Sequence, residues 1–86
     1  MRIGSLAALP QKKNAVNLLI FKTNIGSKKQ VAKVAKLLND EDEILRWNID
    51  LQDIDRVLRI EAINVGKHKI ISIIENAGFF CEELAD

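Results

Sequence analysis

Hydrophobic and polar residues alternate along the chain with two different periods, and these periods predict the order of its secondary structure. Residues 15–23, "AVNLLIFKT", form an apolar run that is too short for a typical helix. We interpret the run as a strand buried on both faces, because fully buried strands are hydrophobic almost without interruption. Such a strand is central in its sheet.

Helical spacing follows after a short uncharged turn, Thr23 to Ser27. Ser27 is a plausible N-cap, since its hydroxyl can accept hydrogen bonds from the first backbone N–H groups of a helix. One stripe of apolar residues with helical spacing follows this turn. A second apolar stripe precedes Gly78, which stands where a left-handed residue would end a helix. The two stripes have the spacing i, i+3, i+4, i+7 and consist of Val31, Val34, Ala35 and Leu38, and of Ile70, Ile73, Ile74 and Ala77.

A period of two marks two further strands with one face toward the core. The polar segment "QDID", residues 52–55, separates them and predicts a hairpin with an acidic loop. "FFCEEL", residues 79–84, is a short last strand. The residues expected to face the core are Leu45, Trp47, Ile49 and Leu51 in one strand and Leu58, Ile60 and Ala62 in the other.

The predicted order is strand, helix, strand, strand, helix, strand. Right-handed crossovers place both helices on one face of a four-stranded antiparallel sheet, which is the α+β, ferredoxin-like βαββαβ fold. In this topology the turn 23–27, the hairpin loop 52–55 and residues 78–79 share one end of the molecule. We expect any site at that end, and we expect His68 at the opposite end.

Length and composition fit one domain. The 86 residues are 48% hydrophobic and 29% charged, which suits a single modest core. We expect a flexible tail over residues 1–13 and a single domain over 14–86. The only cysteine, Cys81, excludes an intrachain disulfide and a multi-cysteine metal site. No membrane span is expected, and the expected location is cytoplasmic.

Charge is divided unevenly between the two parts of the chain. The formal net charge is +1, which argues against a general nucleic-acid binder, but residues 1–39 carry eight basic residues and no acid, so the remainder is −7. We expect the two parts to be interleaved in the fold and to neutralise one another. The alternative is a basic binding face.

The sequence also resembles a heavy-metal-associated (HMA) domain, the fold of small copper chaperones, over residues 16–84. The resemblance is carried by the apolar residues behind the turn 23–27, by the alternation around Trp47 and above all by "IISIIENAGFFCEEL". The family's metal site is a Met-x-Cys-x-x-Cys loop. Alignment without gaps places Lys22 at the methionine, Asn24 at the first cysteine and Ser27 at the second.

Both thiolates of that loop are therefore missing. Soft Cu(I) is held by thiolate sulfur, whereas an amide and a neutral hydroxyl are weak, hard donors. The resemblance thus implies a metal-loop shape without its ligands, in which Ser27 caps its helix and Asn24 stabilises the turn. We predict no metal and no cofactor. Asp50, Asp53 and Asp55 lack a Ca²⁺-loop spacing, and we expect this acidic loop to pair with Lys28 and Lys29.

Two hypotheses about function remain. The first is an HMA-like binding module that acts through protein contacts, by an exposed sheet edge or by a lysine-bearing helix surface that meets an acidic partner. A homodimer is compatible with it. The second is a copper-binding or copper-transport protein with atypical ligands, such as Cys81 or a partner's thiolates. The candidate partner-binding residues are Lys28, Lys29, Lys33 and Lys36.

Catalysis and RNA binding are not expected. A nucleophile needs a nearby base, and the only histidine, His68, is remote from Ser27 and Cys81 in the predicted topology. An RNA-binding sheet needs aromatic residues on its central strands, and "RVLRIEAIN" has none. Gly26 alone is not a phosphate-binding motif.

Overall fold

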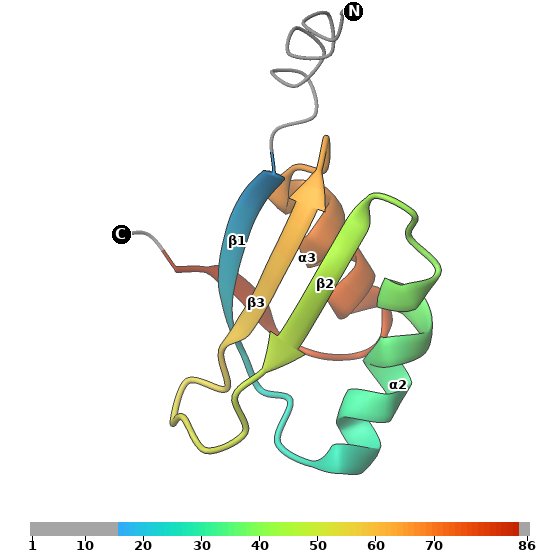
Figure 1. Cartoon of the computed structure of the whole chain (residues 1–86). Coiled ribbons are helices and arrows are strands. Elements are labelled where there is room, and N and C mark those ends of the chain that lie inside the picture. The colour runs from blue at the N-terminus through green and yellow to red at the C-terminus, as the bar shows by residue number, and fades with distance from the viewer. Residues whose placement is uncertain (1–15, 85–86) are drawn as a thin grey trace, which may run out of the picture.

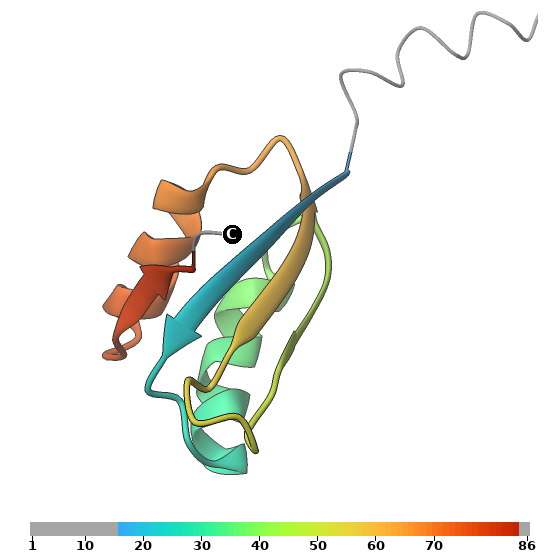
Figure 2. The same cartoon turned by 90° about the vertical axis from the view of Figure 1, so that its left-hand side faces the viewer.

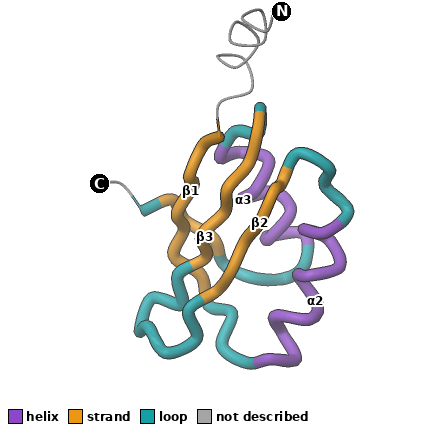
Figure 3. Tube along the Cα trace, in the orientation of Figure 1, coloured by secondary structure: helices purple, strands orange, loops and turns teal. Residues whose placement is uncertain are grey.

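Six elements follow one another in a computed structural model that describes residues 16–84 (Figure 1). The sheet has four strands in the order β2-β3-β1-β4, and each neighbouring pair is antiparallel. Both helices cover the same face of the sheet (Figures 2 and 3). This arrangement confirms the ferredoxin-like prediction. The elements are β1 (Val16–Thr23), α2 (Lys28–Asn39), β2 (Ile44–Ile49), β3 (Leu58–Ile63), α3 (Lys67–Asn76) and β4 (Cys81–Glu83).

The predicted tail over residues 1–13 lies outside the described residues, as do the two ends of the predicted domain 14–86. Among residues 16–84, no helix is long and apolar enough to cross a membrane.

Strand β1 is central in the sheet, as predicted, but the prediction that both of its faces are buried is wrong. Phe21 is fully buried under the helices, whereas Val16 is 52% and Leu18 58% exposed on the other face. The reason is the layering: both helices lie on one side, so the opposite side of β1 faces solvent (Figure 2). An apolar run alone does not distinguish the two cases.

Strand β2 contains an irregularity that changes which residues face the core. Ile44 pairs with Ala62, but Arg46 already pairs with Glu61, so Leu45 is the extra residue of a β-bulge. Leu45 is accordingly 50% exposed, and its predicted place in the core is wrong. The remaining predicted core residues of this strand, Trp47 and Ile49, are partly buried and pack against the core, whereas Leu51 lies beyond the strand.

The helices begin and end where the sequence predicts. Ser27 is the N-cap of α2, and its side chain accepts a hydrogen bond from the backbone N–H of Gln30. Gly78 follows α3 with a φ of +97°, the left-handed conformation that favours glycine. The apolar stripes lie between the helices and the sheet, where Val34, Leu38, Ile70 and Ile74 are completely buried.

Candidate functional site

Three connections meet at one end of the fold, as the topology predicts. They are the turn between β1 and α2, the loop between β2 and β3 and the turn between α3 and β4. The first two lie side by side in both views (Figures 1 and 2). The third is tied to the first by Asn24, whose Oδ1 accepts a hydrogen bond from the backbone N–H of Phe80 at 2.9 Å.

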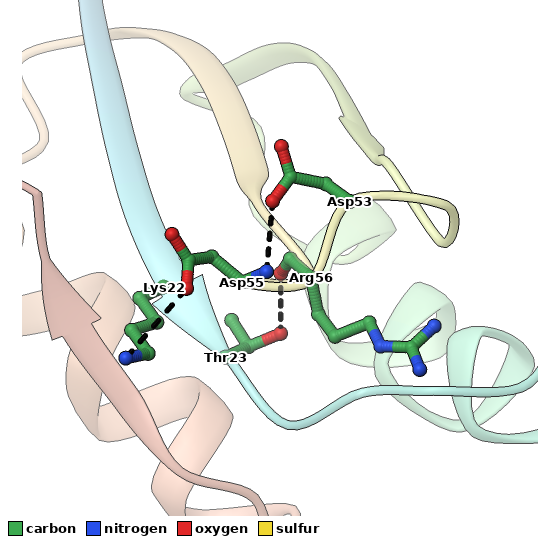
Figure 4. Close-up of polar contacts among 5 residues, drawn as sticks. All are labelled: Lys22, Thr23, Asp53, Asp55 and Arg56. Atoms are coloured by element: carbon green, nitrogen blue, oxygen red, sulfur yellow. Dashed lines mark hydrogen bonds and ion pairs between the residues drawn. The ribbon is translucent and has the colours of Figure 1, made fainter.

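The end of β1 is fastened to the β2–β3 loop through Thr23 (Figure 4). The Thr23 hydroxyl donates to the carbonyl oxygen of Arg56 at 2.7 Å, and the Thr23 backbone N–H donates to the carbonyl oxygen of Asp55 at 3.1 Å. The same hydroxyl oxygen accepts from the backbone N–H of Ile25 at 3.1 Å. Thr23 is a buried polar residue whose hydrogen bonds are satisfied. Sequence reasoning missed its role, which a threonine at the junction of strand and turn could have suggested.

Arg56 reaches from the β2–β3 loop toward the β1–α2 turn. Its φ is +45°, which is unfavourable for a residue with a side chain, and its guanidinium donates from Nη1 to the carbonyl oxygen of Leu51. The guanidinium carbon lies 3.8 Å from the point that a Cβ on Gly26 would occupy. A positive charge therefore stands beside the turn that holds a metal in HMA domains with an intact motif. The sequence reasoning did not assign a role to Arg56.

The two positions aligned with the family's cysteines hold side chains that are already hydrogen-bonded. Ser27 Oγ accepts from the backbone N–H of Gln30 at 3.2 Å, and Gln30 Oε1 accepts from the backbone N–H of Gly26 at 2.7 Å. This reciprocal arrangement resembles a capping box and confirms the predicted capping role of Ser27. Asn24 was predicted to stabilise its own turn. Its side chain instead joins that turn to the connection between α3 and β4, by accepting from the backbone N–H of Phe80, 56 residues further along the chain.

Lys22, aligned with the family's methionine, turns its charge to solvent. Its side chain is 46% exposed, and its Nζ lies 3.6 Å from Oδ1 of Asp55. The prediction that the acidic loop pairs with Lys28 and Lys29 is therefore wrong, because within residues 16–84 the loop pairs with Lys22 instead.

The other acidic side chains of the loop stabilise its own backbone. Asp50 Oδ1 accepts from the N–H of Gln52 at 3.0 Å, and Asp53 Oδ1 accepts from the N–H of Asp55 at 2.8 Å. These are Asx-type turns. Within the described part of the chain, no three side chains of His, Cys, Asp or Glu come together in a way that could hold a metal ion.

Cys81 is a poor metal ligand in this environment. It pairs with Thr23 across the sheet and is only 5% exposed. Burial, with a smaller contribution from the negative charge of Glu75, raises the pKa of the thiol to about 12. Deprotonation of this thiol is consequently about a thousandfold less favourable than that of an ordinary cysteine, and thiolate is the form that binds metal. His68 lies in the first turn of α3, at the opposite end of that helix from the Gly78 turn, as expected.

The lysine residues of α2 form an exposed surface, which we call the lysine surface: Lys28, Lys29, Lys33 and Lys36. Of the four ion pairs described, only Lys22–Asp55 joins the basic part of the chain to the acidic part. The basic and acidic parts of the chain were expected to neutralise one another. Within residues 16–84 this is true of Lys22, whereas the four lysines of the lysine surface form no ion pair. Coulomb repulsion among these lysines favours an acidic counterpart.

A shallow pocket of about 290 Å³ lies within this surface, lined by Lys29, Ala32, Lys33 and Lys36. Lys33 Nζ lies 5.5 Å from the centre of the Phe79 ring, which is a cation–π contact. The lysine surface is thus joined to the α3–β4 turn, and through Phe80 and Asn24 to the β1–α2 turn.

Solved structures with this fold include three that can be compared over most of their length. The CsoZ metallochaperone superposes with a TM-score of 0.66 at 15% identity, over 81% of this chain and 99% of that chain. The apo HMA domain of the copper chaperone for superoxide dismutase has a TM-score of 0.71 at 14% identity, over 85% of this chain and 71% of that chain. Oxidized MerP from Ralstonia metallidurans CH34 has a TM-score of 0.71 at 9% identity, over 83% of this chain and 100% of that chain.

No family model and no curated protein matches the sequence. The chain has the fold of HMA-domain metallochaperones, and at these identities the likeness concerns the fold alone. Function has to be argued from the residues at the loop end and on α2.

Proposed function

We propose that this chain is an HMA-like binding module that acts without a soft-metal site, by docking the lysine surface of α2 onto an acidic protein. The observation that carries the proposal is the use of both former ligand positions inside the fold. Asn24 holds the N–H of Phe80, and Ser27 holds the N–H of Gln30. Their oxygens stabilise loops and helix rather than standing free for a ligand.

The charges around the turn support the same conclusion. A neutral amide and a neutral hydroxyl would leave a bound Cu(I) ion with its positive charge, whereas two thiolates would compensate it. The guanidinium of Arg56 lies beside Gly26, and Lys28 and Lys29 stand in the first turn of α2. A cation without thiolate ligands is repelled at this place.

The proposed role is non-enzymatic, because His68 is separated from Ser27 and Cys81 by the length of α3. The proposed compartment is the cytoplasm, which fractionation of the producing cells would test. A homodimer is compatible with the exposed sheet face, and light scattering would test that state.

The decisive measurement is competition for Cu(I) with a coloured chelator. We expect the parent chain to take no more copper than a lone thiol allows, and we expect Cys81→Ser to change little, because the thiol is buried and loses its proton much less readily than an ordinary cysteine. Tight binding of one copper per chain by the parent would support the alternative function, copper handling with atypical ligands, and would overturn the proposal.

The partner surface is tested by charge reversal. Proteins captured from a lysate at low salt should be lost when Lys29, Lys33 and Lys36 are all changed to Glu, and capture by the parent should weaken steeply with added salt. Two single variants that change the net charge equally serve as the control. Lys36→Glu should weaken capture more than Arg59→Glu, because Arg59 lies on the exposed face of β3 and not on the lysine surface. Equal capture by the triple variant and the parent would remove the lysine surface from consideration.

A further inference from the structure

We infer that the pocket on α2 receives an apolar side chain from the acidic segment that docks there, so that the partner carries an aliphatic residue flanked by carboxylates. This inference rests on the proposed function and specifies its partner. It concerns the pocket lined by Lys29, Ala32, Lys33 and Lys36.

The pocket is lined by one small apolar side chain, Ala32, and by three lysine side chains. Its lining residues stand at i, i+3, i+4 and i+7, one face of a helix, and its volume is about 290 Å³. Ala32 contributes a methyl group between three lysine side chains, each of which has a stem of four methylene groups. An aliphatic side chain can be removed from water between these stems, while carboxylates on either side of it reach the ammonium groups.

One wall of the pocket is held in place from outside the helix. Lys33 Nζ lies over the Phe79 ring, 5.5 Å from its centre, and Phe79 packs against the core. The next residue, Phe80, is fastened by the side chain of Asn24. The stem of Lys33 is therefore preorganised, which lowers the entropic cost of binding.

Charge complementarity identifies the occupant as acidic. Within residues 16–84, neither Lys29 nor Lys36 forms an ion pair, and α2 has no acidic residue in its first turn. A neutral apolar segment would leave these ammonium groups without counter-charges, whereas a purely acidic segment would leave the Ala32 methyl group and the lysine methylene groups in contact with water. An aliphatic residue between carboxylates satisfies both parts of the surface.

The experiment is a titration, followed by NMR, with two end-blocked synthetic peptides, Glu-Glu-Leu-Glu-Glu and Glu-Glu-Ser-Glu-Glu. The peptides have equal charge, so they differ only in the side chain offered to the pocket. We expect both to bind, and the leucine peptide to bind about tenfold more tightly, as burial of one aliphatic side chain implies. The shifts should centre on Ala32 and Lys33.

Variants separate the inference from the function on which it rests. Ala32→Gln places a longer polar side chain in the pocket and should remove the preference for leucine while leaving the serine peptide unaffected. Ser72→Gln, at an exposed position of α3, should leave the preference intact. Equal affinity of the parent for both peptides would overturn the pocket inference and leave the proposed function standing. Failure of both peptides to bind, even at low salt, would overturn the proposed function and the inference with it.

Discussion

At the scale of single residues, the environment of Cys81 determines what the only thiol of the chain can do. The side chain lies opposite Thr23 on the buried face of the sheet, and burial raises its pKa to about 12 from an ordinary value of 9.0. A free cysteine in such a place behaves as a small hydrophobic residue. Its sulfur adds packing to the core and little reactivity.

We predict that Cys81 reacts slowly with a thiol reagent such as Ellman's reagent while the protein is folded. The pKa difference lowers the thiolate fraction at pH 8 by about a thousandfold relative to an unperturbed thiol. The reaction should therefore be at least about a hundredfold faster in urea than in buffer. A similar rate in both solvents would contradict the buried position.

The same pKa shift fixes the sign of a pH effect on stability. The folded state keeps the thiol proton up to a higher pH than the unfolded state. Below about pH 9 the thiol is neutral in both states and does not change the free energy of unfolding. Between about pH 9 and 12 only the unfolded state loses the proton, so stability falls as pH rises. Cys81→Ala should lose less stability over this interval than the parent. The comparison cancels the titration of the lysines, which both proteins share.

At the scale of elements, Asn24 connects two turns that are far apart in the sequence. We predict that Asn24→Ala lowers the free energy of unfolding by about 1 kcal/mol, because the N–H of Phe80 loses its acceptor. Asn24→Asp retains an acceptor oxygen and should recover most of the loss. Urea denaturation measures both, and an unchanged midpoint for the alanine variant would show that water replaces the amide without cost.

Elements with a clear period could be predicted from the sequence, because the period itself reports which side is buried. The stripe ending at Leu38, the cap at Ser27 and the left-handed Gly78 all follow from local chemistry. The sequence of β1 alone does not show whether one or both of its faces are buried, since this depends on which face of the sheet the helices cover. The bulge at Leu45 could not be predicted either, because an alternating pattern does not show where one strand carries an extra residue.

The candidate site was predictable in its location and only partly in its contacts. Topology alone brings the three connections to one end, and the resemblance to the HMA metal loop points to Asn24 and Ser27. The hydrogen bond from Thr23 to Arg56 spans 33 residues, and the one from Phe80 to Asn24 spans 56. Such partners depend on how the loops meet in three dimensions, so sequence spacing did not reveal them.

For the molecule as a whole, the first prediction concerns how much the segment before β1 contributes to stability. We predict that deleting residues 1–13 leaves the thermal midpoint nearly unchanged, because "MRIGSLAALPQKK" has neither a helical nor a strand period and the buried cluster described here is formed by residues 21–81. Calorimetry of the full and shortened chains checks this. A drop of more than a few degrees would show that the segment contributes to the core.

The chain as a whole has the same fold as HMA-domain metallochaperones, and this leads to the last prediction. Asn24→Cys with Ser27→Cys introduces the Cys-x-x-Cys spacing of HMA metal loops into the turn between β1 and α2. The double variant should gain strong Cu(I) binding with one metal per chain. The first N–H groups of α2 and the nearby guanidinium of Arg56 favour thiolates there.

The same substitutions remove the hydrogen bonds of Asn24 and Ser27, so the metal-free double variant should be less stable by about 1 kcal/mol for each. Copper at a hundred times its Kd would restore about 2.7 kcal/mol, which makes the thermal midpoint a second measure of binding. Lys22 should interfere little, because its charge already faces solvent beside Asp55.

Controls for the restored site are the two single cysteine variants and Asn24→Ser, which offers hydroxyls where the double variant offers thiols. Each single variant should bind much less copper than the double variant, because two-coordinate capture needs both sulfurs. Asn24→Ser should bind no more than the parent. Competition with a coloured Cu(I) chelator ranks the four variants and the parent. If the double variant remains folded and binds no better than the parent, the alignment of Asn24 and Ser27 with the metal loop is wrong.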